Sequence, residues 1–318
     1  MLNLLTKRFL FALLFLCADG SVAPGSQQSS DTAEAKAIGF LAREVPAWSK
    51  NNGCFSCHND GDAARALYAA GRKGYAIPQD ALNATTAWVS QPAIWEQNKG
   101  DPGFSDKTLS SVQFASSLLA AFEAGRVTDR QPLEIAARKL IAEQSADGAW
   151  RIEPDSALGS PTTWGTTLTT AMAIKVLQQE GSTKSIEASR RGQRWLSRVT
   201  PNSVLTAATL IMAGTRDRQR EQSLNLLRTG QTSDGGWGPY AKSPPEIFDT
   251  AMALLALSEE AGVGDLIRRG RTFLVSQQQA DGSWIETTRP SGGDSYAQRV
   301  STTGWATLAL LMTSDKAH

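Results

Sequence analysis

Two kinds of predicted helix alternate along the chain. Apolar residues at helical spacing, with Arg and Lys on one side, predict amphipathic helices over residues 133–143 and 267–277. Other runs are apolar nearly all round and predict buried helices. Three of these have similar sequences and begin at Thr170 (TAMAIKVL), Thr250 (TAMALLAL) and Thr303 (TGWATLAL). The alternation predicts a repeated pair of helices.

A seven-residue motif, Gln-x-x-Asp-Gly-x-Trp, lies between the two helices of a pair. It begins at Gln144, Gln231 and Gln278, so the copies are 87 and 47 residues apart. These distances match two units and one unit of roughly 40 to 50 residues, a usual size for helical-pair repeats. Asp-Gly supplies a tight turn and Trp packs between hairpins, so we expect a structural rather than a ligand-binding motif.

The same template divides the chain into six units. Their approximate ranges are 34–73, 78–126, 131–180, 184–216, 218–261 and 264–314. The fourth unit lacks the turn motif and has Pro201 and Asn202 in its place. Six helical hairpins can close into a double ring of inner and outer helices, so we expect an all-α (α/α)6 toroid over residues 34–318. An open solenoid is the structural alternative.

These repeated turns and helices resemble the α/α-toroid superfamily, which includes squalene-hopene cyclases, oxidosqualene cyclases and protein prenyltransferase β-subunits. The resemblance is carried by the three Gln-x-x-Asp-Gly-x-Trp turns and by the helix that begins at Thr250. It covers about residues 34–314 and implies the fold. It implies less about activity, because one fold can carry many functions.

The catalytic groups of that superfamily are not matched in the usual places. Squalene-hopene cyclases carry an Asp-x-Asp-Asp acid that protonates the substrate, and the nearest echo here is Phe248-Asp249, with one carboxylate. The prenyltransferases bind zinc through Asp, Cys and His, but no Cys follows Cys57 and no His lies between His58 and His318. We therefore expect neither activity, although whether the protein is an enzyme stays open.

The composition is that of a globular protein. The chain has 318 residues, is 41% hydrophobic, and carries Lys+Arg 32 against Asp+Glu 31, a net charge of +1. A nearly neutral chain lacks the basic surface that binds nucleic acid, so we expect no nucleic-acid partner. His58 and His318 are the two histidines, and imidazole chemistry must therefore involve His58.

The N-terminal segment has the features of a secretory signal peptide. Lys7 and Arg8 precede an apolar run over residues 9–17, and small and polar residues follow it. We expect residues 1–20 to be removed, residues 21–33 to form a flexible lead-in, and the mature protein to be periplasmic or secreted. The run is too short for a resident membrane helix, so we expect no integral membrane segment; an uncleaved anchor is the alternative.

The first unit departs from the repeat pattern in the turn between its helices. This turn contains Cys54-x-x-Cys57-His58, the attachment motif of haem c. Two thiols at this spacing match the two vinyl groups of the macrocycle, and the adjacent His58 becomes the proximal iron ligand. The alternatives are a disulfide between Cys54 and Cys57, a redox-active thiol pair, and a zinc site that also uses His58 and a carboxylate.

Six further residues are candidates for a site at the mouth of the ring. Met252 and Met172 lie early in inner helices, where either can complete the haem iron or simply fill the core. Asp249 lies one turn into an inner helix, where it either caps the helix or points into the cavity. The aromatic side chains near the same helix starts either line an apolar cavity or pack together; they are Phe248, Trp164 and Trp305.

These features predict a secreted c-type haem protein. We expect electron transfer or haem-based redox sensing, with one covalent haem and with a redox partner protein or an apolar small molecule at the cavity. One alternative is a terpenoid-cyclase-like or prenyltransferase-like enzyme, or a lipophilic-ligand-binding protein, in which Cys54 and Cys57 form a disulfide. A protein-docking scaffold is the other alternative.

Overall fold

The computed structural model describes residues 32–99, 106–155 and 158–314. The expected signal peptide (1–20), nearly all of the expected lead-in (21–33) and His318 lie outside these residues, so the periplasmic or secreted location stays a prediction. The described part of the chain is built from helices and contains no strand. Among the described helices, none has the length and apolar character needed to cross a bilayer.

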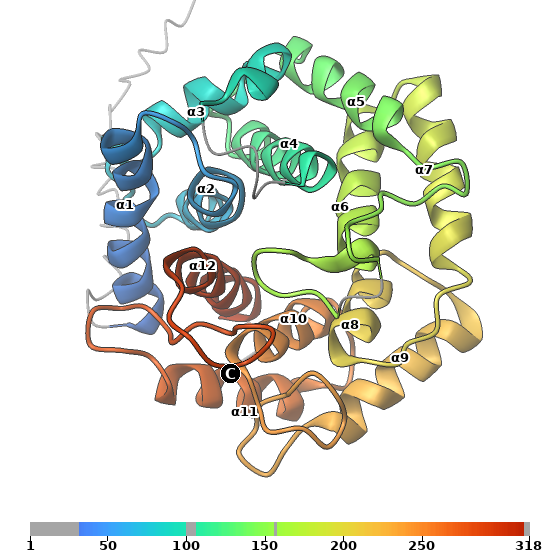
Figure 1. Ribbon diagram of the computed structural model, residues 1–318. Coiled ribbons are helices and arrows are strands. Elements are labelled where there is room, and N and C mark those ends of the chain that lie inside the picture. The colour runs from blue at the N-terminus through green and yellow to red at the C-terminus, as the bar shows by residue number, and fades with distance from the viewer. Residues whose placement is uncertain (1–31, 100–105, 156–157, 315–318) are drawn as a thin grey trace, which may run out of the picture.

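Six helical hairpins form a double ring, seen along its axis in Figure 1. The outer helices are α1 (Ala33–Asn52), α3 (Asn83–Val89), α5 (Gln131–Glu143), α7 (Thr183–Leu196), α9 (Asp217–Gly230) and α11 (Gly264–Ser276). The inner helices are α2 (Ala64–Arg72), α4 (Lys107–Glu123), α6 (Gly165–Glu180), α8 (Val204–Met212), α10 (Ile247–Leu257) and α12 (Tyr296–Thr313). The expected (α/α)6 toroid is confirmed.

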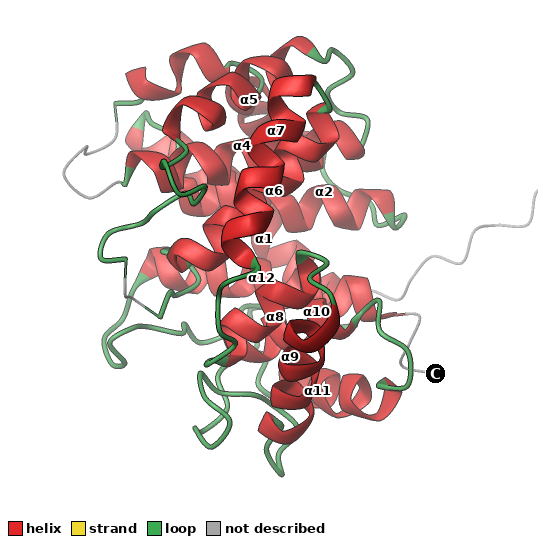
Figure 2. Cartoon of the chain, turned by 90° about the vertical axis from the view of Figure 1, so that its right-hand side faces the viewer, coloured by secondary structure: helices red, strands yellow, loops and turns green. Residues whose placement is uncertain are grey.

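Three short helices complete the ring. A π-helix, η1 (Cys57–Ala63), leads directly into α2, and two 3₁₀ helices, η2 (Gln79–Ala81) and η3 (Pro92–Gln97), flank α3. Seen from the side, long loops between outer and inner helices project from one end of the ring (Figure 2). This end is the mouth at which the inner helices begin.

The tryptophans of the three turn motifs make the same contacts in each unit. Trp150, Trp237 and Trp284 are fully buried. Each indole Nε1 donates a hydrogen bond to the carbonyl ten residues earlier, near the end of the outer helix, at 2.7 to 2.8 Å. Each Trp backbone N–H donates to the hydroxyl of the Thr that begins the repeated inner-helix sequence. The motif therefore joins the two helices of its own hairpin.

The glutamines of the same motifs join neighbouring hairpins. Gln144 Nε2 donates to the Ala188 carbonyl in the next outer helix at 3.0 Å, and Gln231 makes the equivalent bond to the Leu266 carbonyl in α11 at 2.9 Å. In the last unit, Gln278 Nε2 donates to the carbonyl of Ala33 in α1 at 2.8 Å. An ion pair of 2.7 Å between Arg271 and Glu34 supports this junction. The sixth unit thus contacts the first, and the ring is closed rather than an open solenoid.

Candidate functional site

The inner helix of the first unit begins with an unusual turn. The π-helix η1 is capped by Ser56, whose hydroxyl accepts hydrogen bonds from the backbone N–H groups of His58 (3.1 Å) and Asn59 (3.4 Å). The Asp60 carboxylate accepts from the Ser56 N–H at 2.9 Å and from the Thr85 hydroxyl at 2.5 Å. Asp60 is therefore used to hold the turn. π-Helical turns are rare and occur frequently at functional sites.

Asp62, on the same π-helix, is fully buried between three inner elements. Its Oδ2 accepts hydrogen bonds from the Ser301 hydroxyl on α12 (2.8 Å) and from Gln113 Nε2 on α4 (3.2 Å). Its Oδ1 lies 3.5 Å from Nη2 of Arg65. A Cβ on Gly61 would lie 2.9 Å from the Gln113 side chain, so the missing side chain lets α4 approach this closely.

Arg65 lies between two tryptophans near the centre of the ring. Its guanidinium carbon is 5.0 Å from the ring centroid of Trp164 and 4.2 Å from that of Trp305. The two indoles meet edge to face at 5.7 Å, and Phe248 packs on Trp305 in the same way at 5.9 Å. Arg65 Nε and Nη2 have no hydrogen-bond partner among the described residues. The guanidinium is therefore held by the aromatic faces and by the charge of Asp62.

The loop over residues 158–164, here called the cover loop, lies across these groups. It precedes α6 and reaches inward over the middle of the ring (Figure 1). Four consecutive residues are anchored by side chains from the surrounding elements. The anchored atoms are the Gly159 carbonyl (from Arg289), the Ser160 hydroxyl (from Gln298, 3.1 Å), the Pro161 carbonyl (from Trp305, 3.3 Å) and the Thr162 carbonyl (from Gln113, 3.2 Å).

Burial dominates the electrostatics of this region. It raises the pKa of Asp62 from an ordinary 3.8 to about 7, against the opposing charge of Arg65. Burial also raises the pKa of Asp60 to about 7, lowers that of His58 to about 4, and raises that of Cys57 to about 12. Asp62 therefore carries a proton in a large fraction of molecules near neutral pH, whereas His58 is neutral.

The raised pKa of Asp62 predicts a pH-dependent stability. Because the folded chain binds this proton more tightly than the unfolded chain, the stabilisation is complete below pH 4 and is lost as pH rises through about 7. His58 acts in the opposite sense, since its lowered pKa gives stability that is lost as pH falls toward 4. When the pH is lowered from 8 to 5, we expect the melting temperature of the wild type to rise more than that of Asp62→Asn. Equal changes in melting temperature for both proteins would contradict the assignment.

The structure brings together three of the residues singled out in the sequence and separates others. Trp164, Trp305 and Phe248 are each at most 3% exposed, and Trp305 packs edge to face against both of the others. Met252 is fully buried in the core, and Met172 is half-buried.

Asp249 does not cap its helix. Its carboxylate is ion-paired with Arg289, which also lies 3.1 Å from Glu246. Burial raises the pKa of Asp249 and the charge of Arg289 opposes that rise. Arg289 reaches from this carboxylate to the cover loop, so Asp249 supports the loop from the side opposite α4.

The structure shows the surroundings of Cys54, Cys57 and His58, for which the sequence left several roles open. Cys54 is buried, Cys57 is half-buried, and both are free thiols in the structure. The disulfide alternative stays a prediction. The described ranges contain no cluster of three or more His, Cys, Asp or Glu side chains that could hold a metal ion, and the zinc alternative has no support there. His58 Nδ1 is buried without a hydrogen-bond partner among the described residues. Haem attachment at Cys54, Cys57 and His58, and iron ligation by Met252 or Met172, stay predictions.

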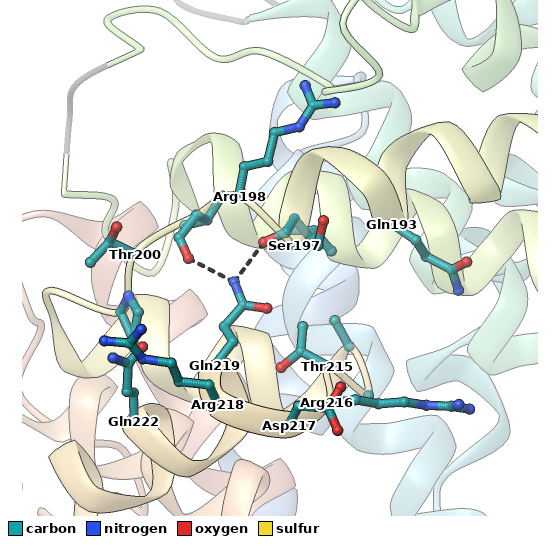
Figure 3. A pocket seen from close by; sticks show the side chains of 15 residues that line it. Gln193, Ser197, Arg198, Thr200, Thr215, Arg216, Asp217, Arg218, Gln219 and Gln222 are labelled. Carbon is teal, nitrogen blue, oxygen red and sulfur yellow. Dashed lines mark hydrogen bonds between the residues drawn. The ribbon is translucent and has the colours of Figure 1, made fainter.

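A surface pocket of about 810 Å³ lies between the end of α7 and the start of α9 (Figure 3). Gln219 Nε2 crosses it and donates to the carbonyls of Leu196 (2.8 Å) and Val199 (2.6 Å). This contact joins units four and five where the turn motif is missing. The pocket shares no lining residue with the group around Asp62, so we assign it to the repeat architecture.

Sequence reasoning missed Asp62, Arg65 and Gln113. One pattern could have found Asp62, because Asp60-Gly61-Asp62-Ala63 has carboxylates at two of the three acidic positions of Asp-x-Asp-Asp. Asp62 also precedes Ala66-Leu67 as Asp249 precedes Ala253-Leu254, which places both carboxylates at one repeat position. No local pattern could have found Gln113, since it reaches Asp62 from a helix 51 residues away.

Comparisons with known proteins point to terpene cyclases. No protein-family model matches the sequence. Drimenyl diphosphate synthase from Streptantibioticus cattleyicolor is 25% identical over 205 residues, which cover 58% of this chain and 37% of that enzyme. Lanosterol synthase erg7A from Aspergillus fumigatus is 33% identical over 103 residues, 29% of this chain and 13% of that enzyme. The chain thus spans well under half the length of these curated relatives.

Solved structures share the fold at lower identity. The type II terpene cyclase MstE from Scytonema superposes with a TM-score of 0.54 at 15% identity and covers 89% of this chain and 98% of its own. A variant of MstE has been solved with its substrate geranylgeranyl dihydroxybenzoate. A glycosidase has a TM-score of 0.56 at 12% identity and covers 91% of this chain and 99% of its own. The protein has a terpene-cyclase-like α/α-toroid fold.

The expected role as a cytochrome c-like electron carrier or redox sensor is wrong. The relatives that match up to 60% of this chain are terpene cyclases and synthases, and the structural neighbours include a type II terpene cyclase. The prediction relied on five residues, Cys54 to His58, and set aside what the repeats implied about activity. In the structure the neighbouring π-helix instead places an acid, Asp62, near the centre of the ring.

Proposed function

We propose that the protein binds an isoprenoid, or a similarly lipophilic molecule with carbon–carbon double bonds, inside the toroid and acts on it as an acid-initiated cyclase. Asp62 is the proposed acid. The observation that carries the proposal is the fully buried Asp62 carboxyl, with its pKa raised to about 7, joined through Arg65 to the indole rings of Trp164 and Trp305. The cyclase relatives, and the prenylated substrate of a protein with this fold, support the choice of ligand.

The proposed reaction needs no co-reactant. Asp62 donates its proton to a double bond at the end of the chain, which forms a C–H bond and leaves a carbocation. The electron pair of the next double bond closes a ring and moves the positive charge along the chain. The last carbocation loses a proton to water, and water returns one to Asp62. The product is therefore an isomer of the substrate.

Three neighbours stabilise the carboxylate that remains after proton transfer. Arg65 supplies a positive charge at 3.5 Å, and the Ser301 hydroxyl and the Gln113 amide donate hydrogen bonds to Oδ2. Such groups strengthen a buried acid because they favour its ionised form, while burial keeps the acid protonated beforehand. The single carboxyl therefore has the flanking groups that an acid of this kind requires.

A ligand reaches Asp62 from the mouth of the ring. A pocket of about 460 Å³ opens beside the cover loop and is lined by Leu158, Trp164, Trp195, Leu205 and Tyr240, among others. This volume is within the usual range for small-molecule sites. Trp164 lines this pocket and also packs on Arg65, so it lies between the pocket and the ion pair of Arg65 with Asp62. Entry to the interior therefore requires Trp164 and the cover loop to move.

Incubation with prenylated compounds tests the proposal. The purified protein is mixed with farnesyl diphosphate or geranylgeranyl dihydroxybenzoate, and the products are separated by chromatography and mass spectrometry. We expect a new compound of unchanged mass with fewer double bonds. Lipid extraction of the purified protein provides a second measurement. If both prenyl compounds neither bind nor react, the proposal is overturned; if they bind without reacting, the acid role is overturned and lipophilic binding remains.

A further inference from the structure

The cover loop approaches the buried Asp62 in two ways: through the bridging side chain of Gln113, and through its own Trp164, whose indole lowers the pKa of the Asp62 carboxyl. Gln113 Nε2 donates to Asp62 Oδ2 and to the Thr162 carbonyl of the cover loop, both at 3.2 Å. Gln113 is 1% exposed, so this bridge lies inside the ring. The remaining anchors of the loop, from Gln298, Trp305 and Arg289, do not contact Asp62.

The two oxygens of Asp62 have different surroundings. Oδ2 accepts two hydrogen bonds, from Ser301 and Gln113, whereas Oδ1 has no hydrogen-bond partner among the described residues. An oxygen with two donors aimed at it serves as an acceptor, so Oδ2 is held by α12 and α4. Oδ1 faces the Arg65 guanidinium at 3.5 Å without a hydrogen bond and is therefore the less constrained of the two oxygens.

Few charged groups lie close enough to influence the pKa of Asp62. Arg65, one turn further along the chain, faces Oδ1, and the Cys57 thiol on η1 is coupled electrostatically to the same carboxyl. Cys57 is neutral at physiological pH, because burial raises its pKa to about 12. The groups that face Asp62 from α4 and α12, Gln113 and Ser301, are uncharged. Burial is therefore the main factor that raises the pKa of Asp62, and the cover loop is one of the elements around the acid.

We propose that Gln298 is a positioning residue that fixes the cover loop across the ring and thereby excludes water from Asp62. The acid can then protonate a substrate only while the loop is closed. Gln298 Nε2 donates to the Ser160 hydroxyl at 3.1 Å, and the same hydroxyl lies 3.2 Å from the Thr162 hydroxyl and 3.0 Å from that of Thr163. One bond from α12 thus orders the segment that Gln113 connects to the acid. This inference rests on the proposed role of Asp62.

Titration of the Asp62 carboxyl by infrared difference spectroscopy tests the inference without any ligand. The protonated C=O band is followed against pH, with the Asp62→Asn spectrum subtracted to remove other carboxyls. The wild-type midpoint is expected near 7. Gln298→Ala loosens the loop without touching Asp62, so its midpoint should fall by at least one pH unit. Ser160→Ala, which removes the other partner of the same bond, should act in the same direction.

Ser301→Ala is the matched control, because Ser301 lies on the same helix as Gln298 but donates to Asp62 and not to the loop. Loss of this donor disfavours the ionised acid, so the midpoint should rise. Hydrogen exchange of residues 158–164 should quicken in Gln298→Ala and Ser160→Ala only. Unchanged exchange, or faster exchange with an unchanged midpoint, overturns the inference. Failure of the cyclase proposal appears separately, as absence of product in the wild type.

Discussion

Asp62→Asn is expected to lower the rate of prenyl conversion by roughly 10²- to 10⁴-fold, the usual contribution of a positioned general acid. Asparagine has nearly the same shape as aspartate, and its amide can still accept the hydrogen bond from Ser301. It cannot give a proton to a double bond. Binding of the prenyl compound should stay within a few-fold of the wild type, because Arg65, Trp164 and Trp305 are unchanged. Single-turnover kinetics with a separate binding titration make the measurement.

Asp249→Asn is the matched control for that experiment. Asp249 occupies the same repeat position on α10, is also fully buried, and is paired with an arginine, Arg289. Its replacement leaves that arginine, which also anchors the cover loop, short of a counter-charge, so the melting temperature should fall. Conversion should fall less than in Asp62→Asn, because the acid itself is retained. If Asp249→Asn abolishes conversion and Asp62→Asn does not, the acid is Asp249 and the assignment to Asp62 is wrong.

Gly282→Ala is expected to destabilise the closed ring by roughly 2–5 kcal/mol. Gly282 has a φ of 93°, and a Cβ there would overlap the carbonyl oxygen of Lys36 in α1. The equivalent Cβ atoms on Gly148 and Gly235 would lie 2.5 and 2.6 Å from carbonyl oxygens of the next outer helix. At Gly282 the next helix is the first of the chain, so the substitution acts on ring closure. Thermal unfolding followed by circular dichroism measures the loss.

Gly292→Ala is the control that separates the steric clash of the added Cβ from the cost of the left-handed backbone conformation. Gly292 has a φ of 96°, close to that of Gly282, but a Cβ at this position would meet no described atom within 4 Å. Its substitution should cost only the left-handed conformation, about 1–2 kcal/mol. Equal destabilisation by the two alanines would mean that the approach of the last turn to α1 does not hold the ring together.

The architecture could be predicted because its determinants are local and repeated. In each turn motif the Trp indole donates to a carbonyl ten residues earlier, and the glycine lies where a side chain would meet the next helix. Gln278, the last glutamine of the series, uses on α1 the same contact that Gln144 uses on α7. The three copies of the turn motif therefore specify both the hairpin and its junction with the next hairpin. Ring closure follows from the count of six units.

The site could not be predicted in the same way, because its contacts join distant parts of the chain. Gln113 and Ser301 reach Asp62 across 51 and 239 residues, and Arg65 contacts Trp164 in the cover loop and Trp305 on α12. The Asp60-Gly61-Asp62 carboxylates were visible, but they follow directly after Cys54–His58. The attachment motif dominated the interpretation of that segment and led to the incorrect electron-transfer function.

Reaction in deuterated water tests the central claim most directly, namely that Asp62 transfers a proton to carbon inside the ring. The wild-type protein, equilibrated in D₂O, is given a prenyl compound, and the product is analysed by mass spectrometry. We predict an isomer of the substrate that retains one deuterium on carbon after return to H₂O, and none from Asp62→Asn. Conversion without deuterium on carbon, or equal labelling by the variant, would contradict the account.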